Sequence, residues 1–140
     1  MRVSRFLLAA GLAVLVGAGS VTILSAQSKT DEDYSKLMKA VGAANGALRG
    51  AAKEQNPAGV SAEAAKLVVL FKDAQQFWTA RNNAEAAEWS GAAMNHADAL
   101  AKATDMTVAM GAMKELGGTC QTCHAKYREK TETGFAIKKG

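Results

Sequence analysis

This 140-residue chain contains few prolines, cysteines and histidines and has a small net charge. It has one proline and no run in which β-branched and polar residues alternate, so the sequence does not support β-strands. It has two cysteines and two histidines, so a zinc site with four such ligands would have to use every one of them. The formal net charge is only +4. No basic patch with interleaved aromatic residues stands out, which argues against nucleic acid as a partner.

The N-terminus has the pattern of a secretory signal. Arg2 and Arg5 supply a positive start, an uncharged and mostly apolar stretch follows, and Ala26 is a small residue before a cleavage site. The stretch is long enough that an uncleaved membrane anchor is the alternative, although its glycines suit a cleaved signal better. We therefore expect residues 1–26 to be a signal peptide or an uncleaved anchor, and residues 27–140 to form a single domain.

The rest of the chain predicts helices. The first begins at Thr30, which precedes three acidic residues that the helix dipole favours, and it is broken at Asn56-Pro57. Ser61 is expected to cap the second helix, and Asn82-Asn83 to form the turn that follows it. The third helix is expected at about residues 84–103.

The fourth helix is expected to start at Thr104-Asp105 and to fray near Gly134. Each helix carries an apolar stripe at three- and four-residue steps. Four such helices with short connections predict an all-α fold, an antiparallel four-helix bundle with its cofactor site between facing core positions. Four methionines of the last two helices are expected to pack in the core: Met94, Met106, Met110 and Met113.

The most informative segment is Cys120-Gln-Thr-Cys123-His124. This C-x-x-C-H pattern is the attachment site of c-type haem. On a helix, the two cysteines lie one turn apart on the face that also carries His124. Two thiols at that distance can form thioethers with the vinyl groups along one edge of a porphyrin, and the adjacent imidazole can reach the iron as its proximal ligand. The segment predicts one covalently attached haem c in the bundle, held by the last helix.

A pair of cysteines at this spacing also occurs in thioredoxin-like redox sites and in zinc sites. A thioredoxin-like redox site needs a βαβ context, which this sequence lacks. A zinc site would have to recruit His96 together with Cys120, Cys123 and His124.

Export agrees with the haem prediction. In an oxidising compartment two lone cysteines normally pair as a disulfide, and thioether bonds to haem would prevent Cys120 and Cys123 from doing so. We therefore expect the protein in the bacterial periplasm, with membrane contact only if residues 1–26 stay uncleaved.

A four-helix bundle with C-x-x-C-H in its last helix resembles the class II c-type cytochromes, the cytochrome c′ superfamily. The resemblance covers essentially residues 29–132. It is most specific at Cys120-Gln-Thr-Cys123-His124-Ala-Lys-Tyr127-Arg128, which matches the C-x-x-C-H-x-x-Y-R typical of the family. A second match is Lys36-Leu37-Met38-Lys39 in the first helix. Class I cytochromes c carry their haem motif near the N-terminus, so that fold is disfavoured.

The resemblance implies roles for single residues. Cys120 and Cys123 would form the thioethers, His124 would be the proximal iron ligand, and Arg128 would lie near the haem on the proximal side. Without the resemblance, Arg128 is equally well explained as an ordinary cation in the last turns of a helix, where the helix dipole favours positive charge.

The resemblance also gives Met38 a role, because the first helix of this family supplies the residue over the open face of the iron. Leu or Phe there leaves the iron five-coordinate and high-spin, whereas Met gives a low-spin branch, and His/Met ligation raises the reduction potential. Two alternatives stay open. Met38 could fill the core while Leu37 covers the haem, or His96 of the third helix could reach the iron instead. We expect Met38 to be the distal ligand.

The expected function is that of a one-electron carrier that exchanges electrons with redox partner proteins and is not an enzyme. Peroxidase-like catalysis would need a distal acid–base residue, and the first helix offers none beside Met38. The alternative is a five-coordinate, cytochrome c′-like protein that binds NO or CO at an open sixth position. A homodimer is also open, since many members of the family pair through their first two helices.

Overall fold

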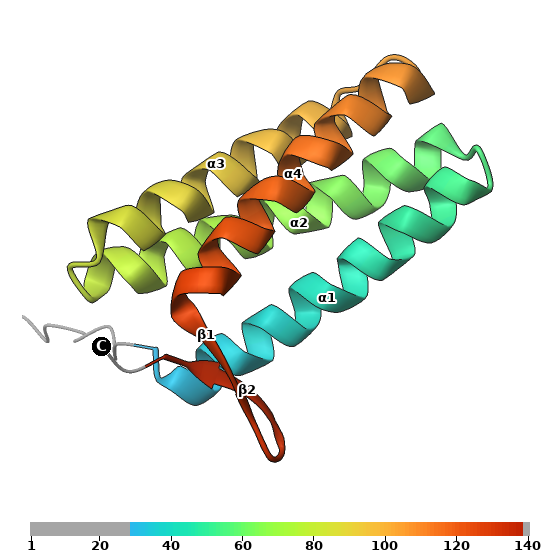
Figure 1. The fold of residues 1–140 in the computed structure, drawn as a ribbon. Helices are drawn as coiled ribbons and strands as arrows, with labels where there is room; N and C mark the ends of the chain where they lie inside the picture. The colour runs from blue at the N-terminus through green and yellow to red at the C-terminus, as the bar shows by residue number, and fades with distance from the viewer. Residues whose placement is uncertain (1–28, 139–140) are drawn as a thin grey trace, which may run out of the picture.

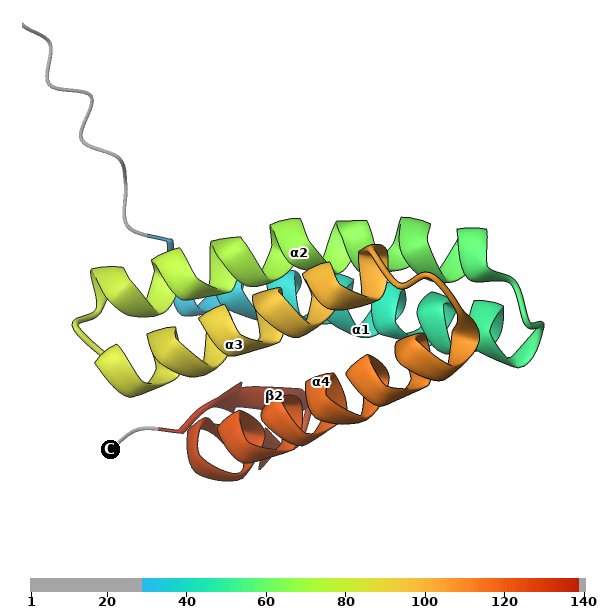
Figure 2. The ribbon, with the colours of Figure 1, turned by 90° about the horizontal axis from the view of Figure 1, so that it is seen from above.

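The computed structural model describes residues 29–138 as four helices followed by a β-hairpin (Figure 1). The helices are α1 (Asp31–Lys53), α2 (Pro57–Ala80), α3 (Ala84–Ala101) and α4 (Met106–Tyr127), and the strands are β1 (Arg128–Thr131) and β2 (Gly134–Ile137). Consecutive helices run antiparallel, and the closest packing joins α1 with α2, α2 with α3 and α3 with α4 (Figure 2). The predicted helical bundle is thus confirmed.

The predicted signal or anchor, residues 1–26, lies outside the described residues. Within residues 29–138, no helix combines the length and the hydrophobicity that crossing a bilayer requires.

Three of the predicted helix starts are confirmed by their caps. Thr30 accepts a hydrogen bond from the backbone N–H of Asp33 at 3.2 Å, and the Asp33 carboxylate accepts one from the Thr30 N–H at 2.8 Å. Asn83 and Asp105 cap α3 and α4 in the same way, each through a side-chain oxygen that accepts a backbone N–H three residues on.

The prediction that Ser61 caps the second helix was wrong. Asn56 caps α2 by accepting the Gly59 N–H at 2.9 Å, and Pro57 occupies the first turn, where its missing N–H costs nothing. The Asn-Pro pair therefore starts a helix as well as ending one. Ser61 lies inside α2 and donates its hydroxyl to the Ala101 carbonyl at 2.7 Å, which ties the start of α2 to the end of α3.

The end of the chain also differs from the prediction. We expected no strand and a helix fraying near Gly134, but α4 ends at Tyr127 and an antiparallel hairpin follows, with Arg128 opposite Ile137. Gly134 permits the turn because its φ of 147° is a conformation that residues with a side chain avoid. The Lys138 N–H donates to the Tyr127 carbonyl at 2.8 Å and fastens the hairpin to the helix.

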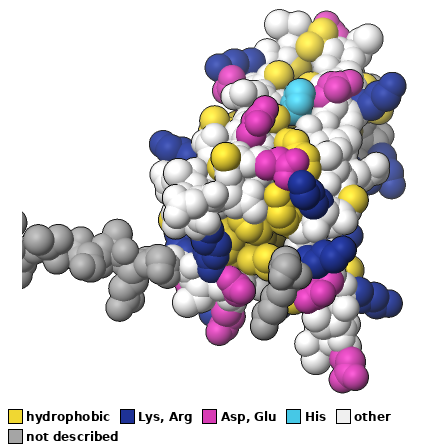
Figure 3. All heavy atoms as spheres, turned by 60° about the vertical axis from the view of Figure 1, so that its left-hand side comes forward, with side chains coloured by type: hydrophobic (Ala, Val, Ile, Leu, Met, Phe, Trp, Pro, Cys, Tyr) yellow, Lys and Arg dark blue, Asp and Glu magenta, His cyan; other side chains and the backbone are white. Residues whose placement is uncertain are grey.

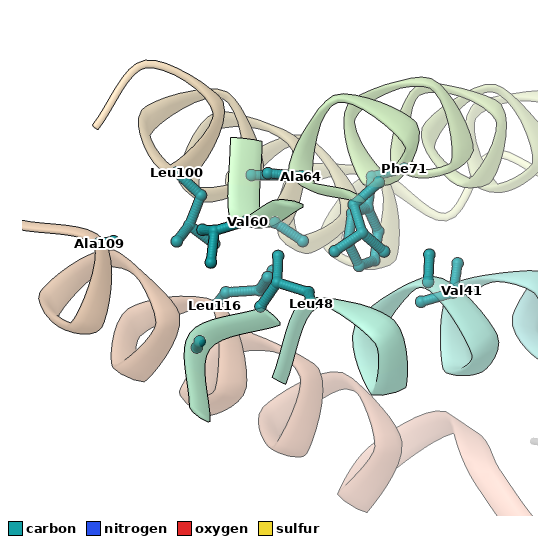
Figure 4. Close-up of a cluster of buried hydrophobic side chains, with 13 residues drawn as sticks. Val41, Leu48, Val60, Ala64, Phe71, Leu100, Ala109 and Leu116 are labelled. Atoms are coloured by element: carbon teal, nitrogen blue, oxygen red, sulfur yellow. The ribbon is translucent and has the colours of Figure 1, made fainter. Parts of the chain in front are cut away.

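The core runs along the inside of the bundle (Figure 4). Its best buried aliphatic side chains include Leu48, Val60 and Leu100, each at most 1% exposed. A second cluster, around Phe77 and Trp78, closes the end where α4 meets the hairpin.

Three of the four methionines expected in the core pack against its larger cluster: Met94, Met106 and Met113. Met110 does not, since it is 55% exposed, and that expectation was wrong. The buried positions of α4 are Ala109 and Leu116, and Met110 is one residue past Ala109, about 100° around the helix.

Candidate functional site

A pocket opens into the bundle between all four helices, with an empty volume, including its mouth, of about 380 Å³. Figure 3 shows the end of the molecule at which α4 meets the hairpin, where hydrophobic side chains reach the surface beside Lys, Arg, Asp and Glu. The walls are mostly apolar, as is typical of a cofactor site. The lining from α2 and α3 consists of Phe71, Ala74, Trp89, Ser90 and Ala93.

The wall from α4 contains the sequence-predicted residues. Cys120, Cys123 and His124 all line the pocket, together with Thr119. All four are half-buried. The α-helix places them on one face because they lie three and four residues apart. Both cysteines are free thiols.

Burial sets the protonation of these groups. It raises the pKa of Cys120 and raises that of Cys123 to about 11, so both sulfurs keep their protons at neutral pH. Reactive redox cysteines have lowered pKa values, so this environment does not favour the thioredoxin-like alternative. Burial, and next the charge of Arg128, lower the pKa of His124, so its imidazole is neutral and has a lone pair to offer a metal.

The wall from α1 contains Met38. Its side chain is half-buried, packs against the aliphatic core and lines the pocket beside Tyr34 and Val41. Leu37 is also half-buried but is not part of the lining. Of the two neighbours that the sequence left open, Met38 is therefore the one at the pocket.

Tyr34 also lines the pocket, although the sequence indicated only that it lies on the apolar stripe of the first helix. Its ring stacks on Phe77 with a centroid distance of 4.2 Å, and its hydroxyl oxygen accepts a hydrogen bond from the Trp78 indole N–H at 3.0 Å. Burial raises the pKa of Tyr34 to about 12, with smaller additions from the nearby Cys123 and Cys120 thiols. The i, i+4 spacing to Met38 was the signal that could have identified it.

A hydrogen-bonded anchor holds the end of α4. The Tyr127 hydroxyl donates to the Glu85 carboxylate at 2.7 Å and lies 3.2 Å from the side-chain oxygen of Asn83. Lys126 forms an ion pair with the same carboxylate. These contacts hold the turn that bears Cys123 and His124 against the start of α3, so the α4 wall has a fixed position.

Two other sequence-predicted residues lie outside the lining. Arg128 starts β1, directly after the helix, and its guanidinium lies 4.2 Å from the centre of the Phe135 ring. Its charge lowers the pKa of His124, and its role beside a haem stays a prediction. His96 is half-buried on α3 and does not line the pocket.

The zinc alternative gains no support from this arrangement. Within residues 29–138, no three His, Cys, Asp or Glu side chains gather where they could hold one metal ion. The fourth ligand that zinc would need, His96, is not at the pocket.

The types of side chain in the pocket are those that a covalently attached haem needs. The pocket combines two protonated thiols one turn apart, a neutral imidazole, a thioether and apolar walls. A haem needs more room than this volume, and the side of the pocket between α1 and α4 is the least tightly closed, because these two helices are not among the closely packed pairs.

Comparisons with protein-family models, with curated protein sequences and with solved structures found no match to this chain. The resemblance to class II cytochromes therefore rests on the residues quoted for it.

Proposed function

We propose that this protein is an exported, periplasmic mono-haem c-type cytochrome that carries single electrons. Cys120 and Cys123 attach the haem, His124 is the proximal iron ligand and Met38 is the distal one. One observation supports this above all: Met38, far from the motif in the sequence, lines the same pocket as the two cysteines and the histidine. Bound there, haem iron would supply one-electron cycling between Fe(III) and Fe(II).

Each cysteine contributes one covalent bond. The thiol would add across a vinyl group of the haem, so that a carbon–sulfur bond would form, the S–H bond would break and the proton would go to the other vinyl carbon. No electrons are lost, and hence no oxidant is needed. The raised pKa values of Cys120 and Cys123 mean that both are thiols at neutral pH, the form that this addition would consume.

His124 and Met38, the two proposed iron ligands, suit electron transfer better than acid–base catalysis. Neutral His124 and the Met38 thioether bind without first losing a proton, and a Met ligand favours Fe(II) and raises the reduction potential. Tyr34 is the ionisable residue on the α1 wall, and with a pKa of about 12 it keeps its proton at neutral pH. Such a group is poorly matched to general acid–base catalysis near pH 7.

Absorption spectra of the holoprotein in both oxidation states test the ligand assignment. The ferric protein should be low-spin and show the weak sulfur-to-iron charge-transfer band in the red. Met38→Leu should abolish the band, turn the iron high-spin and open a site for CO on the ferrous form. Leu37→Met is the matched control, since Leu37 is outside the pocket, and it should leave the spectrum unchanged.

Two outcomes would reassign the distal position. A wild-type protein that is already high-spin and binds CO or NO readily would remove Met38 from the iron and favour the gas-binding alternative. A low-spin spectrum that survives Met38→Leu but is lost in His96→Ala would give the position to His96.

A further inference from the structure

Three residues that carry a hydroxyl group line the pocket: Tyr34, Ser90 and Thr119. They differ in whether the hydroxyl has a hydrogen-bond acceptor. Ser90 donates to the Ala86 carbonyl at 2.8 Å, one turn back along α3. Thr119 donates in the same way along α4, to the Glu115 carbonyl at 3.1 Å. Both protons are therefore used within the helix that carries them, and neither is available to a molecule in the pocket.

The third hydroxyl, on Tyr34, does not donate to the backbone of its own helix. Its oxygen accepts the hydrogen bond from Trp78, and a phenol has one further bond to make, as a donor. Within residues 29–138, the structure gives that proton no acceptor. Because stacking on Phe77 and edge contact with Trp78 at 5.2 Å fix the ring, the hydroxyl is held ready at little entropic cost.

We propose that Tyr34 donates a hydrogen bond to the sulfur of Met38 and thereby raises the reduction potential of the iron that Met38 binds. This inference rests on the proposed function. The two residues lie one turn apart on α1 and line one pocket, and the Cα–Cβ bond of Met38 leans toward the turn that bears Tyr34.

The chemistry follows from the sulfur's electron pairs. A thioether that binds iron with one lone pair keeps the other, and a hydrogen bond to that second pair draws electron density away from the metal. Fe(III) needs this density more than Fe(II) does, so the bond favours the reduced state. Hydrogen bonds of this kind, to a ligand instead of to the metal, are an established means by which proteins tune potentials.

The test compares two variants of the holoprotein that each remove one hydroxyl, the first in the pocket and the second outside it. Tyr34→Phe retains the ring that stacks on Phe77 but has no proton to donate. It should shift the midpoint potential to a lower value and displace the sulfur-to-iron band. Thr79→Val removes a hydroxyl outside the pocket, which donates to the Gln75 carbonyl one turn back along α2, and it should move neither quantity. A purely structural role for Tyr34 would lower the melting temperature without moving the band.

A double-mutant cycle shows whether the effect passes through Met38. In a Met38→Leu background the acceptor is gone, so Tyr34→Phe should shift the potential much less than it does in the wild type. An equal shift in both backgrounds, or no shift in the wild type, overturns the inference.

A further variant covers the case in which Tyr34→Phe does not retain its haem. Trp78→Phe keeps the phenol but removes the indole that polarises it, so a smaller shift in the same direction is expected, and no shift overturns the inference. A wild type without covalent haem would defeat the proposed function itself, whereas covalent haem with no response in these variants defeats the role of Tyr34 alone.

Discussion

Where α1 turns into α2, the core consists of aliphatic side chains such as Leu48 and Val60, whereas near the hairpin it consists of stacked rings such as Tyr34, Phe77 and Trp78. Aliphatic groups need only be buried and packed. Tyr34 and Trp78 also carry polar atoms that require partners, and their mutual hydrogen bond fixes the orientation of both rings. One end of the bundle thus supplies stability alone, and the other also positions a site.

The largest stability effect is expected at the aliphatic end. Leu48 is completely buried, so Leu48→Ala should lower the free energy of unfolding by about 2–5 kcal/mol through lost burial and the cavity left behind. Urea unfolding followed by circular dichroism measures this. Met38→Ala, at a half-buried pocket position, is the matched control and should cost less. Equal losses in the two variants would contradict the division between the ends.

A smaller loss is expected at the anchor of α4. Tyr127→Phe removes a hydrogen bond to the Glu85 carboxylate and should lower the free energy of unfolding by about 1 kcal/mol, measured in the same way. Lys126→Gln removes an exposed ion pair to the same carboxylate and should change stability far less. If Lys126→Gln proved the more damaging of the two, the anchor would be electrostatic and would not depend on the tyrosine.

The aromatic end should also respond to alkaline pH. The unfolded Tyr34 phenol ionises near its ordinary pKa of 10.0, but the folded one only near 12, so the folded state keeps a proton that the unfolded chain releases. The contribution of Tyr34 is therefore constant below pH 10 and is lost as pH rises toward 12, by about 1 kcal/mol one unit above the unfolded pKa.

Urea unfolding at a series of alkaline pH values, on wild type and Tyr34→Phe, isolates this contribution. The decline above pH 10 should be shallower in Tyr34→Phe. Identical slopes would mean that the phenol ionises equally well in the folded protein.

The sequence predicted the features that depend on local chemistry. Capping side chains such as Thr30 and Asp105 act on backbone N–H groups a few residues away, and the C-x-x-C-H spacing needs only a helix to place its groups on one face. These are properties of neighbouring residues. The hairpin was missed because its alternation is only Phe135 and Ile137, too short to stand out.

Features that depend on distant partners could not be predicted. Ser61 resembles a cap in the sequence, yet its hydroxyl bonds to a carbonyl at the end of α3. The ring and hydroxyl of Tyr34 contact Phe77 and Trp78 of another helix, which the sequence of α1 could not show. Met38 was placed beside the motif by resemblance, and its position in the pocket agrees with that expectation without testing ligation.

The most direct measurement of the central claim is acid–acetone extraction of the protein after export from cells that contain a haem-attachment system. The account predicts that the wild type keeps its colour in the aqueous phase, because two thioether bonds hold the haem. Replacing both Cys120 and Cys123 with alanine should release it to the organic phase. A wild-type protein that gives up its haem, or that is purified colourless with zinc bound, would contradict the account.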